Sequence, residues 1–191
     1  DFYTFVSISV QSLSQKFKSP GIIQYNDIKE TTVGIAIGDV AGHGVSSALV
    51  MALSFGILGK IGQRTTSPSE VLKRANEDIR RFITSSQISH VTAIYSVFHP
   101  ETKMFTYASA GHNPALLIRK HDSSVNELSA QGAFLGMYPD ETYDEHKIQL
   151  EPGDRVVLYT DGITEPTNHN RELYGEERLK ACLVDHSEQD I

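Results

Sequence analysis

The sequence predicts an α+β fold, in which helices are grouped beside antiparallel strands, and three observations support this. Two helical patterns follow one another directly, at residues 45–59 and 67–83. Strand patterns joined by short connections dominate the segment from Val91 to Thr160. One more helix is predicted from about Glu176 to Val184. Because helices and strands do not alternate, the pattern favours layers of antiparallel sheet and helix over repeated βαβ units.

Length and composition fit one globular domain and exclude some functions. The chain has 191 residues, of which 39% are hydrophobic and 21% charged. Its net charge of -7 argues against a nucleic-acid groove, which needs a basic surface. That charge suits a site that gathers cations, although mild acidity also simply favours solubility. The one cysteine, Cys182, favours a reducing, cytoplasmic setting. The longest apolar stretch, Ala48 to Leu58, is too short to cross a membrane, so no membrane contact is predicted.

The N-terminal part is predicted to hold two strands separated by an insertion. Residues 2–10 alternate apolar and polar side chains, which is typical of a strand with one buried face. Thr31–Asp39 is rich in β-branched residues and predicts a buried strand that ends at the aspartate. The polar segment 12–27 between them is interpreted as an insertion, either a surface hairpin or a contact for a substrate or partner.

Both central helices show apolar residues at helical spacing. In the first, the predicted buried face consists of Val45, Ala48, Leu49, Ala52, Phe55 and Gly59. The second begins at a capping box, in which Ser67 is the cap, Pro68 takes the first helical position and Glu70 completes the box. Its predicted buried face consists of Val71, Leu72, Ala75, Ile79, Phe82 and Ile83.

The next segment is predicted to form a series of strands. Val91–His99 and Met104–Ser109 are expected to pair as a hairpin. Further strands are expected at Ala115–Arg119, Val125–Leu128 and Lys147–Leu150. Residues 151–154 (EPGD) then predict a type II turn, because Pro and Gly occupy its two central positions. The buried strand Arg155–Thr160 follows this turn and leads directly into Asp161.

Two predicted strands end at an aspartate, Asp39 and Asp161. A carboxylate at the end of a buried strand is costly to desolvate unless it meets a cation or hydrogen-bond donors. Carboxylates that converge from different strands form an oxygen-rich site of the kind that Mg²⁺ or Mn²⁺ prefers, and no zinc-like Cys or His spacing is present. Alternatively, each aspartate caps the element after it. Gly42 and Gly44 favour the site at Asp39, because glycine permits backbone to lie close to an ion or phosphate.

Other motifs fit residues 38–47 less well. Gly42-His43-Gly44 follows a strand and opens a helix, as in a dinucleotide fingerprint, but Ser47 replaces the third glycine and no strand ending in an acid follows. No Gly-Lys-Ser/Thr of a P-loop is present. The Gly-x-Ser-x-Gly elbow of a serine hydrolase is also missing.

Several segments resemble, in order, the signature blocks of SpoIIE/RsbU-type phosphatases, the bacterial branch of the PPM (type-2C) family. The three main blocks are 38–49 (GDVAGHGVSSAL), 108–115 (ASAGHNPA) and 158–165 (LYTDGITE). Shorter matches occur at 134–136, 151–154 and 174–179, and Asp1-Phe2-Tyr3 resembles the end of the family's Gly-Gly-Asp-Phe-Tyr start. The resemblance spans nearly the whole chain.

The resemblance implies an αββα sandwich of two antiparallel sheets flanked by helices, with a site for two Mn²⁺ or Mg²⁺ ions. Carried over by position, Asp39 would bind both ions, the carbonyl of Val40 would bind one, and Asp161 would bind the other. Asp1 would lie on the Val40 side. The implied reaction is hydrolysis of protein phosphoserine or phosphothreonine by a water that the metals activate.

The resemblance also implies partners. The expected substrate is a STAS-type anti-sigma-factor antagonist, and an upstream sensor domain in the same chain would act on the two central helices. A homodimer is left open. The chain is interpreted as one phosphatase domain, residues 1–191, forming the catalytic C-terminal part of a longer protein. The family's further aspartate in an Asp-Asp-Ile/Met-Thr strand is missing, which indicates either a truncated sequence or weak binding of one metal. This absence is the one support for the alternative, a non-catalytic regulatory or binding module.

Two histidines could act as proton donors to the leaving oxygen. His43 is retained as a candidate, although a histidine between glycines often binds backbone. His112 is interpreted as structural. The other histidines, among them His90, are interpreted as surface or packing residues.

Overall fold

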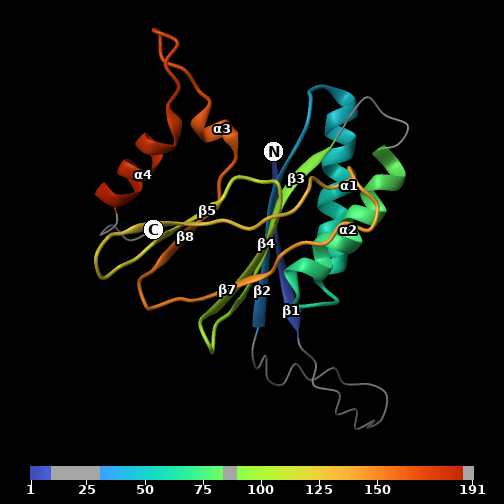
Figure 1. Ribbon diagram of the computed structural model, residues 1–191, viewed down its shortest axis with the longest axis horizontal. Helices are drawn as coiled ribbons and strands as arrows, with labels where there is room; N and C mark the ends of the chain where they lie inside the picture. The colour runs from blue at the N-terminus through green and yellow to red at the C-terminus, as the bar shows by residue number, and fades with distance from the viewer. Residues whose placement is uncertain (10–30, 84–89, 187–191) are drawn as a thin grey trace, which may run out of the picture.

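Two antiparallel sheets form the centre of the computed structural model, which describes residues 1–9, 31–83 and 90–186 (Figure 1). The larger sheet has the order β1-β2-β3-β4-β7, and the smaller has the order β6-β5-β8. The strands of the larger sheet are β1 (Phe2–Ser9), β2 (Thr31–Val40), β3 (Val91–His99), β4 (Met104–Ala110) and β7 (His146–Gln149). Those of the smaller are β5 (Ala115–Ile118), β6 (Val125–Leu128) and β8 (Arg155–Val157). The predicted insertion at 12–27 and the chain end at 189–191 lie outside the described residues.

Three apolar clusters separate four layers. The first lies between the larger sheet and helices α1 (Val45–Gly62) and α2 (Pro68–Ile83), which cover one face of this sheet (Figure 1). The second joins the two sheets through residues such as Phe105 and Leu117. The third packs α4 (Gly175–Asp185) against the smaller sheet, where Leu179 meets Leu116. This arrangement confirms the predicted α+β class and αββα sandwich.

Helix α1 buries a different face from the one predicted. Val45, Leu49 and Phe55 are 78%, 67% and 47% exposed, whereas the buried positions are Ser47, Val50, Ser54, Leu58, Ile61 and Gly62. The prediction was wrong because α1 is apolar nearly all round, so helical spacing does not single out one face. By length and composition α1 could span a membrane, but its inner face packs on the larger sheet.

Helix α2 begins as predicted, with half of the expected capping box. The Glu70 N–H donates to Ser67 Oγ at 3.3 Å, while the Glu70 carboxylate pairs with Arg74 instead of returning to Ser67. Ser67 Oγ in turn donates to Glu145 at 2.7 Å, which ties the start of α2 to the segment before β7. The predicted apolar face is buried except at Phe82, which is exposed.

The last predicted strand is shorter than expected, and a helix follows it. β8 ends at Val157, because its pairing with β5 stops at the Leu116–Val157 pair. Residues 158–160 continue without ladder bonds, and Asp161 begins a four-residue helix, α3 (Asp161–Thr164), which was not predicted. Asp161 thus follows a buried segment, as expected, but lies at a helix start.

The turn that leads into β8 is held by a buried carboxylate. Gly153 has a φ of +92°, as a type II turn requires, and the Asp154 N–H donates to the Glu151 carbonyl at 3.1 Å. The Asp154 carboxylate is only 1% exposed, and it accepts from the Arg119 guanidinium at 2.6 Å and from the N–H of Lys120 at 3.1 Å. These bonds fix the end of β5 to the start of β8.

Replacing Asp154 by Asn is expected to lower the free energy of unfolding by about 2–3 kcal/mol, because the Arg119 charge loses its partner. Burial alone would raise the pKa of Asp154, but the hydrogen bonds and the Arg119 charge outweigh it and hold this pKa below its usual value. The carboxylate's contribution is therefore present above about pH 4 and is lost as the pH falls through the lowered pKa. Urea unfolding between about pH 7 and pH 3 measures both effects. Parallel pH profiles for wild type and Asp154→Asn would contradict this.

Candidate metal centre

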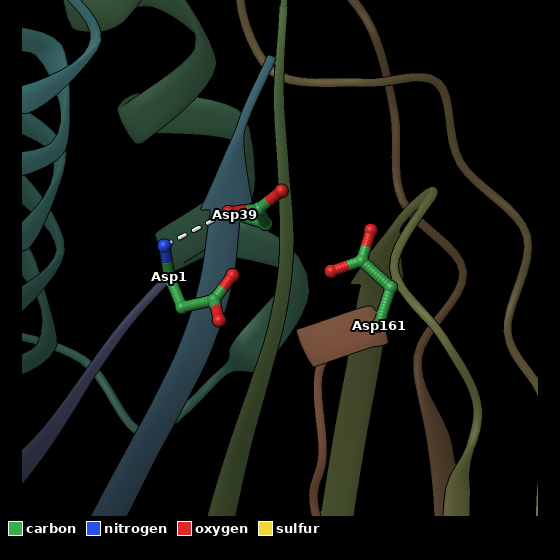
Figure 2. A group of neighbouring side chains, drawn as sticks. All are labelled: Asp1, Asp39 and Asp161. Atoms are coloured by element: carbon green, nitrogen blue, oxygen red, sulfur yellow. Dashed lines mark ion pairs between the residues drawn. The ribbon is translucent and has the colours of Figure 1, made fainter. Parts of the chain in front are cut away.

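Three carboxylates from distant parts of the chain meet at one edge of the larger sheet. Asp1, Asp39 and Asp161 each offer an oxygen, and these oxygens lie within 4.8 Å of one another (Figure 2). The antiparallel register of β1 and β2 pairs Phe2 with Gly38, so Asp1 comes to lie beside Asp39. Asp161 approaches from the start of α3. The structure thus brings together the three aspartates that the resemblance placed at one site.

Polar contacts orient two of these carboxylates. The main-chain nitrogen of Asp1 lies 2.9 Å from Asp39 Oδ1 (Figure 2), and Thr160 Oγ1 donates to Asp1 Oδ2 at 3.0 Å. Within the described residues, no lysine or arginine forms an ion pair with any of the three aspartates. Three carboxylates this close repel one another, and a bound cation would relieve the repulsion.

The donor set fits Mg²⁺ or Mn²⁺. All three side chains offer oxygen ligands, which these ions prefer at distances of about 2.0–2.2 Å. A separation of up to 4.8 Å also suits a pair of ions, which in two-metal sites lie about 3.5–4 Å apart. Val40 is buried and ends β2 directly beside Asp39. The role of its carbonyl as a ligand stays a prediction.

Gly162 allows Asp1 to approach α3. A β-carbon at this position would lie 2.8 Å from Asp1 Oδ2 and 3.4 Å from Thr160 Oγ1. Any larger residue would therefore require the Asp1 carboxylate to shift. The Asp-Gly pair at 161–162 is explained by this close approach.

The carboxylates Asp39 and Asp161 open into a pocket of about 330 Å³ whose lining includes His90, Thr92 and His112. His112 is buried, and its Nε2 lies 3.1 Å from the Tyr159 carbonyl, so Nε2 carries the proton. Its Nδ1 then accepts from Thr92 Oγ1 at 2.9 Å. Burial lowers the pKa of His112. This effect of burial is larger than the combined upward effects of the Tyr159 carbonyl, Asp39 and Asp161. His112 is thus a neutral, doubly bonded histidine, in agreement with its structural interpretation.

His43 directly follows the pocket residue Gly42 but does not itself line the pocket. Its side chain is exposed. Its predicted role as a proton donor stays a prediction.

Two residues of the pocket were missed by the sequence interpretation. His90 packs, as one of its two interpretations has it, by stacking on Phe134 with ring centroids 4.4 Å apart, but it also lines the pocket. Thr92 pairs with Asp39 across β2 and β3. The resemblance at residues 134–136 could have pointed to His90. Leu135 of this block pairs by two backbone hydrogen bonds with Val91, the residue directly after His90. Thr92 carried no signal, because the register of β2 against β3 is not visible in the sequence.

Known proteins share the sequence pattern and the fold of this chain. Residues 29–191 match the family described as Stage II sporulation protein E (SpoIIE). The phosphoserine phosphatase RsbU of Bacillus subtilis (strain 168) is 31% identical over 165 residues. The match covers 86% of this chain and 49% of RsbU, so the chain spans about half the length of that relative.

Solved structures share the fold. The SiaA-PP2C domain of Pseudomonas aeruginosa has a TM-score of 0.71 at 19% identity, over 98% of this chain and 66% of that one. RsbX, solved in complex with magnesium, has a TM-score of 0.60 at 15% identity, over 98% of this chain and 80% of that one. The family model matches residues 29–191, and the αββα sandwich is shared with these solved structures, so the chain belongs to the SpoIIE family.

Proposed function

We propose that the chain is a metal-dependent protein phosphatase that hydrolyses phosphoserine or phosphothreonine on a partner protein. The convergence of Asp1, Asp39 and Asp161 within 4.8 Å carries this proposal. Asp39 would hold two Mn²⁺ or Mg²⁺ ions, with Asp1 and the Val40 carbonyl on one and Asp161 on the other. When bound, the ions lower the pKa of a water and neutralise charge on the phosphoryl group.

The protein's own groups hold and orient this site. Thr160 fixes the Asp1 carboxylate by a hydrogen bond of 3.0 Å. Thr92 and the Tyr159 carbonyl fix the orientation of the His112 ring, while burial lowers its pKa, so this ring adds no positive charge that would repel the cations. His90 and Asn113 line the same pocket and face the space that a phosphoryl group would enter.

The proposed substrate is a phosphorylated STAS-type anti-sigma-factor antagonist in the cytoplasm. The name of RsbU, phosphoserine phosphatase, supports the residue type. The net charge of -7 gives no long-range attraction for free anions, so specificity would come from contacts with a protein surface.

Regulation is proposed to act through α1 and α2. Their exposed apolar residues Val45, Leu49, Phe55 and Phe82 offer a surface for a sensor domain of the same protein. RsbU is about twice as long as its matched stretch, which leaves room for such a domain in that relative. α1 begins only six residues after Asp39, so a shift of this helix would reach the metal ligands directly. A second copy of the chain is the competing occupant of this surface.

Manganese-dependent hydrolysis of p-nitrophenyl phosphate tests the proposal, since this small ester reports the metal centre without protein docking. Wild type is expected to turn over with Mn²⁺ and to stop with a chelator, and Asp39→Asn is expected to lose at least about 100-fold. Equal rates with and without metal, or in wild type and Asp39→Asn, would overturn the enzyme and favour the non-catalytic module.

A further inference from the structure

A second pocket lies on the other side of the helix that carries Asp161. It measures about 400 Å³ and is lined by residues of α3, of the segment 165–174 and of α4. We call it the α3 groove and define it by Ile163, Pro166, Tyr174 and Arg178. Residues two positions apart in an α-helix, such as Asp161 and Ile163, differ by about 200° around its axis and lie about 5 Å apart. Ile163 therefore points away from Asp161 while remaining next to the metal centre.

The wall of the α3 groove is held by local hydrogen bonds. Asn168 Oδ1 accepts from the N–H of Asn170 at 2.9 Å and from that of Glu172 at 3.1 Å. The Asn168 N–H donates to the Glu172 carbonyl at 3.0 Å, and the Tyr174 N–H donates to the Pro166 carbonyl at 2.8 Å. These bonds fold residues 166–174 into a hairpin that is formed before any ligand arrives, so binding there needs little ordering of the protein.

The chemistry of the α3 groove favours an uncharged, apolar occupant. Glu172 and Arg178 both line it and pair with each other at 3.9 Å, so their charges compensate locally. Ile163 is 50% exposed and lines the groove together with Pro166 and Tyr174. An apolar side chain placed here would cover Ile163 without meeting an uncompensated charge.

We propose that the α3 groove binds an apolar side chain of the phosphoprotein substrate, about two to four residues from the phosphorylated one. An extended peptide covers about 3.3 Å per residue, so this spacing leads from the metal centre around α3 to Ile163. The inference rests on the proposed phosphatase function and adds a determinant of substrate choice. The phosphoryl group is bound at the aspartates, and the neighbouring apolar residue selects the partner.

The test uses phosphoserine peptides in which one position, two to four residues before or after the phosphoserine, carries either Leu or Ala. Each Leu peptide is compared with its Ala counterpart. For wild type with Mn²⁺, kcat/KM is expected to be about 10-fold higher for Leu than for Ala at one of these positions. In Ile163→Ala this ratio is expected to fall to about 1. Because it is a ratio within one variant, a general loss of activity near the metal centre does not affect it. Leu173→Ala is the matched control, since Leu173 is 57% exposed in the same hairpin but does not line the groove. It should keep the wild-type ratio.

The outcomes separate the two proposals. Turnover of p-nitrophenyl phosphate with no preference for Leu at any position would overturn the groove and leave the phosphatase standing. An unchanged preference in Ile163→Ala would also overturn the groove. No metal-dependent turnover of any phosphate ester would overturn the phosphatase and the groove with it.

Discussion

Replacing Asp161 by Asn is expected to reduce manganese-dependent turnover of p-nitrophenyl phosphate by at least about 100-fold. Loss of a residue that merely supports a metal ligand costs about 10–100-fold, and a ligand itself should cost more. The same change should leave the melting temperature in metal-free buffer unchanged or higher. It removes one of three mutually repelling carboxylates, and no lysine or arginine among the described residues pairs with Asp161.

Thermal unfolding with and without Mn²⁺ separates these two effects. A metal at about 100 times its Kd stabilises the folded state by about 2.7 kcal/mol, so wild type should melt higher with Mn²⁺ and Asp161→Asn should gain less. Asp140→Asn is the control, because it removes the same charge from an exposed residue outside the cluster. A large fall in the metal-free melting temperature of Asp161→Asn would show that the carboxylate holds the fold, contrary to this account.

Replacing Gly38 by Ala is expected to destabilise the protein by about 3 kcal/mol or more. An added β-carbon would overlap the Thr92 carbonyl oxygen and would lie 2.7 Å from the ring of Phe2. The carbonyl belongs to the β2–β3 ladder and cannot move without β3, and Phe2 is buried next to Asp1. Activity should fall as well, because Gly38 and Phe2 directly adjoin Asp39 and Asp1, two of the proposed metal ligands.

Gly56→Ala is the control for Gly38→Ala, measured by urea unfolding at 25 °C. No heavy atom lies within 4 Å of a β-carbon at Gly56, which is in α1, so this change should stabilise the protein by about 0.5–1 kcal/mol. Equal unfolding midpoints for Gly38→Ala and wild type would show that the strands can separate enough to admit the methyl group.

Local patterns in the sequence predicted most of the elements. Ser67 and Pro68 mark the start of α2, and Pro152-Gly153 marks the turn before β8, because each depends on backbone chemistry within a few residues. The prediction failed at α1, where apolar residues on nearly all sides left the choice of face to the neighbouring elements. It also failed at α3, since the end of β8 depends on where its pairing with β5 stops.

The sequence by itself determined the α+β class, the aspartates at the ends of two apolar segments, and the resemblance that grouped Asp1 with them. Only the tertiary structure decided which further residues share the pocket. His90 and Thr92 come to Asp39 through the register of β3 against β2, and Ile163 lies beside the hairpin at 166–174 because α3 turns it away from the metal centre. Contacts between residues far apart in the chain depend on strand register and layer packing, which no local pattern encodes.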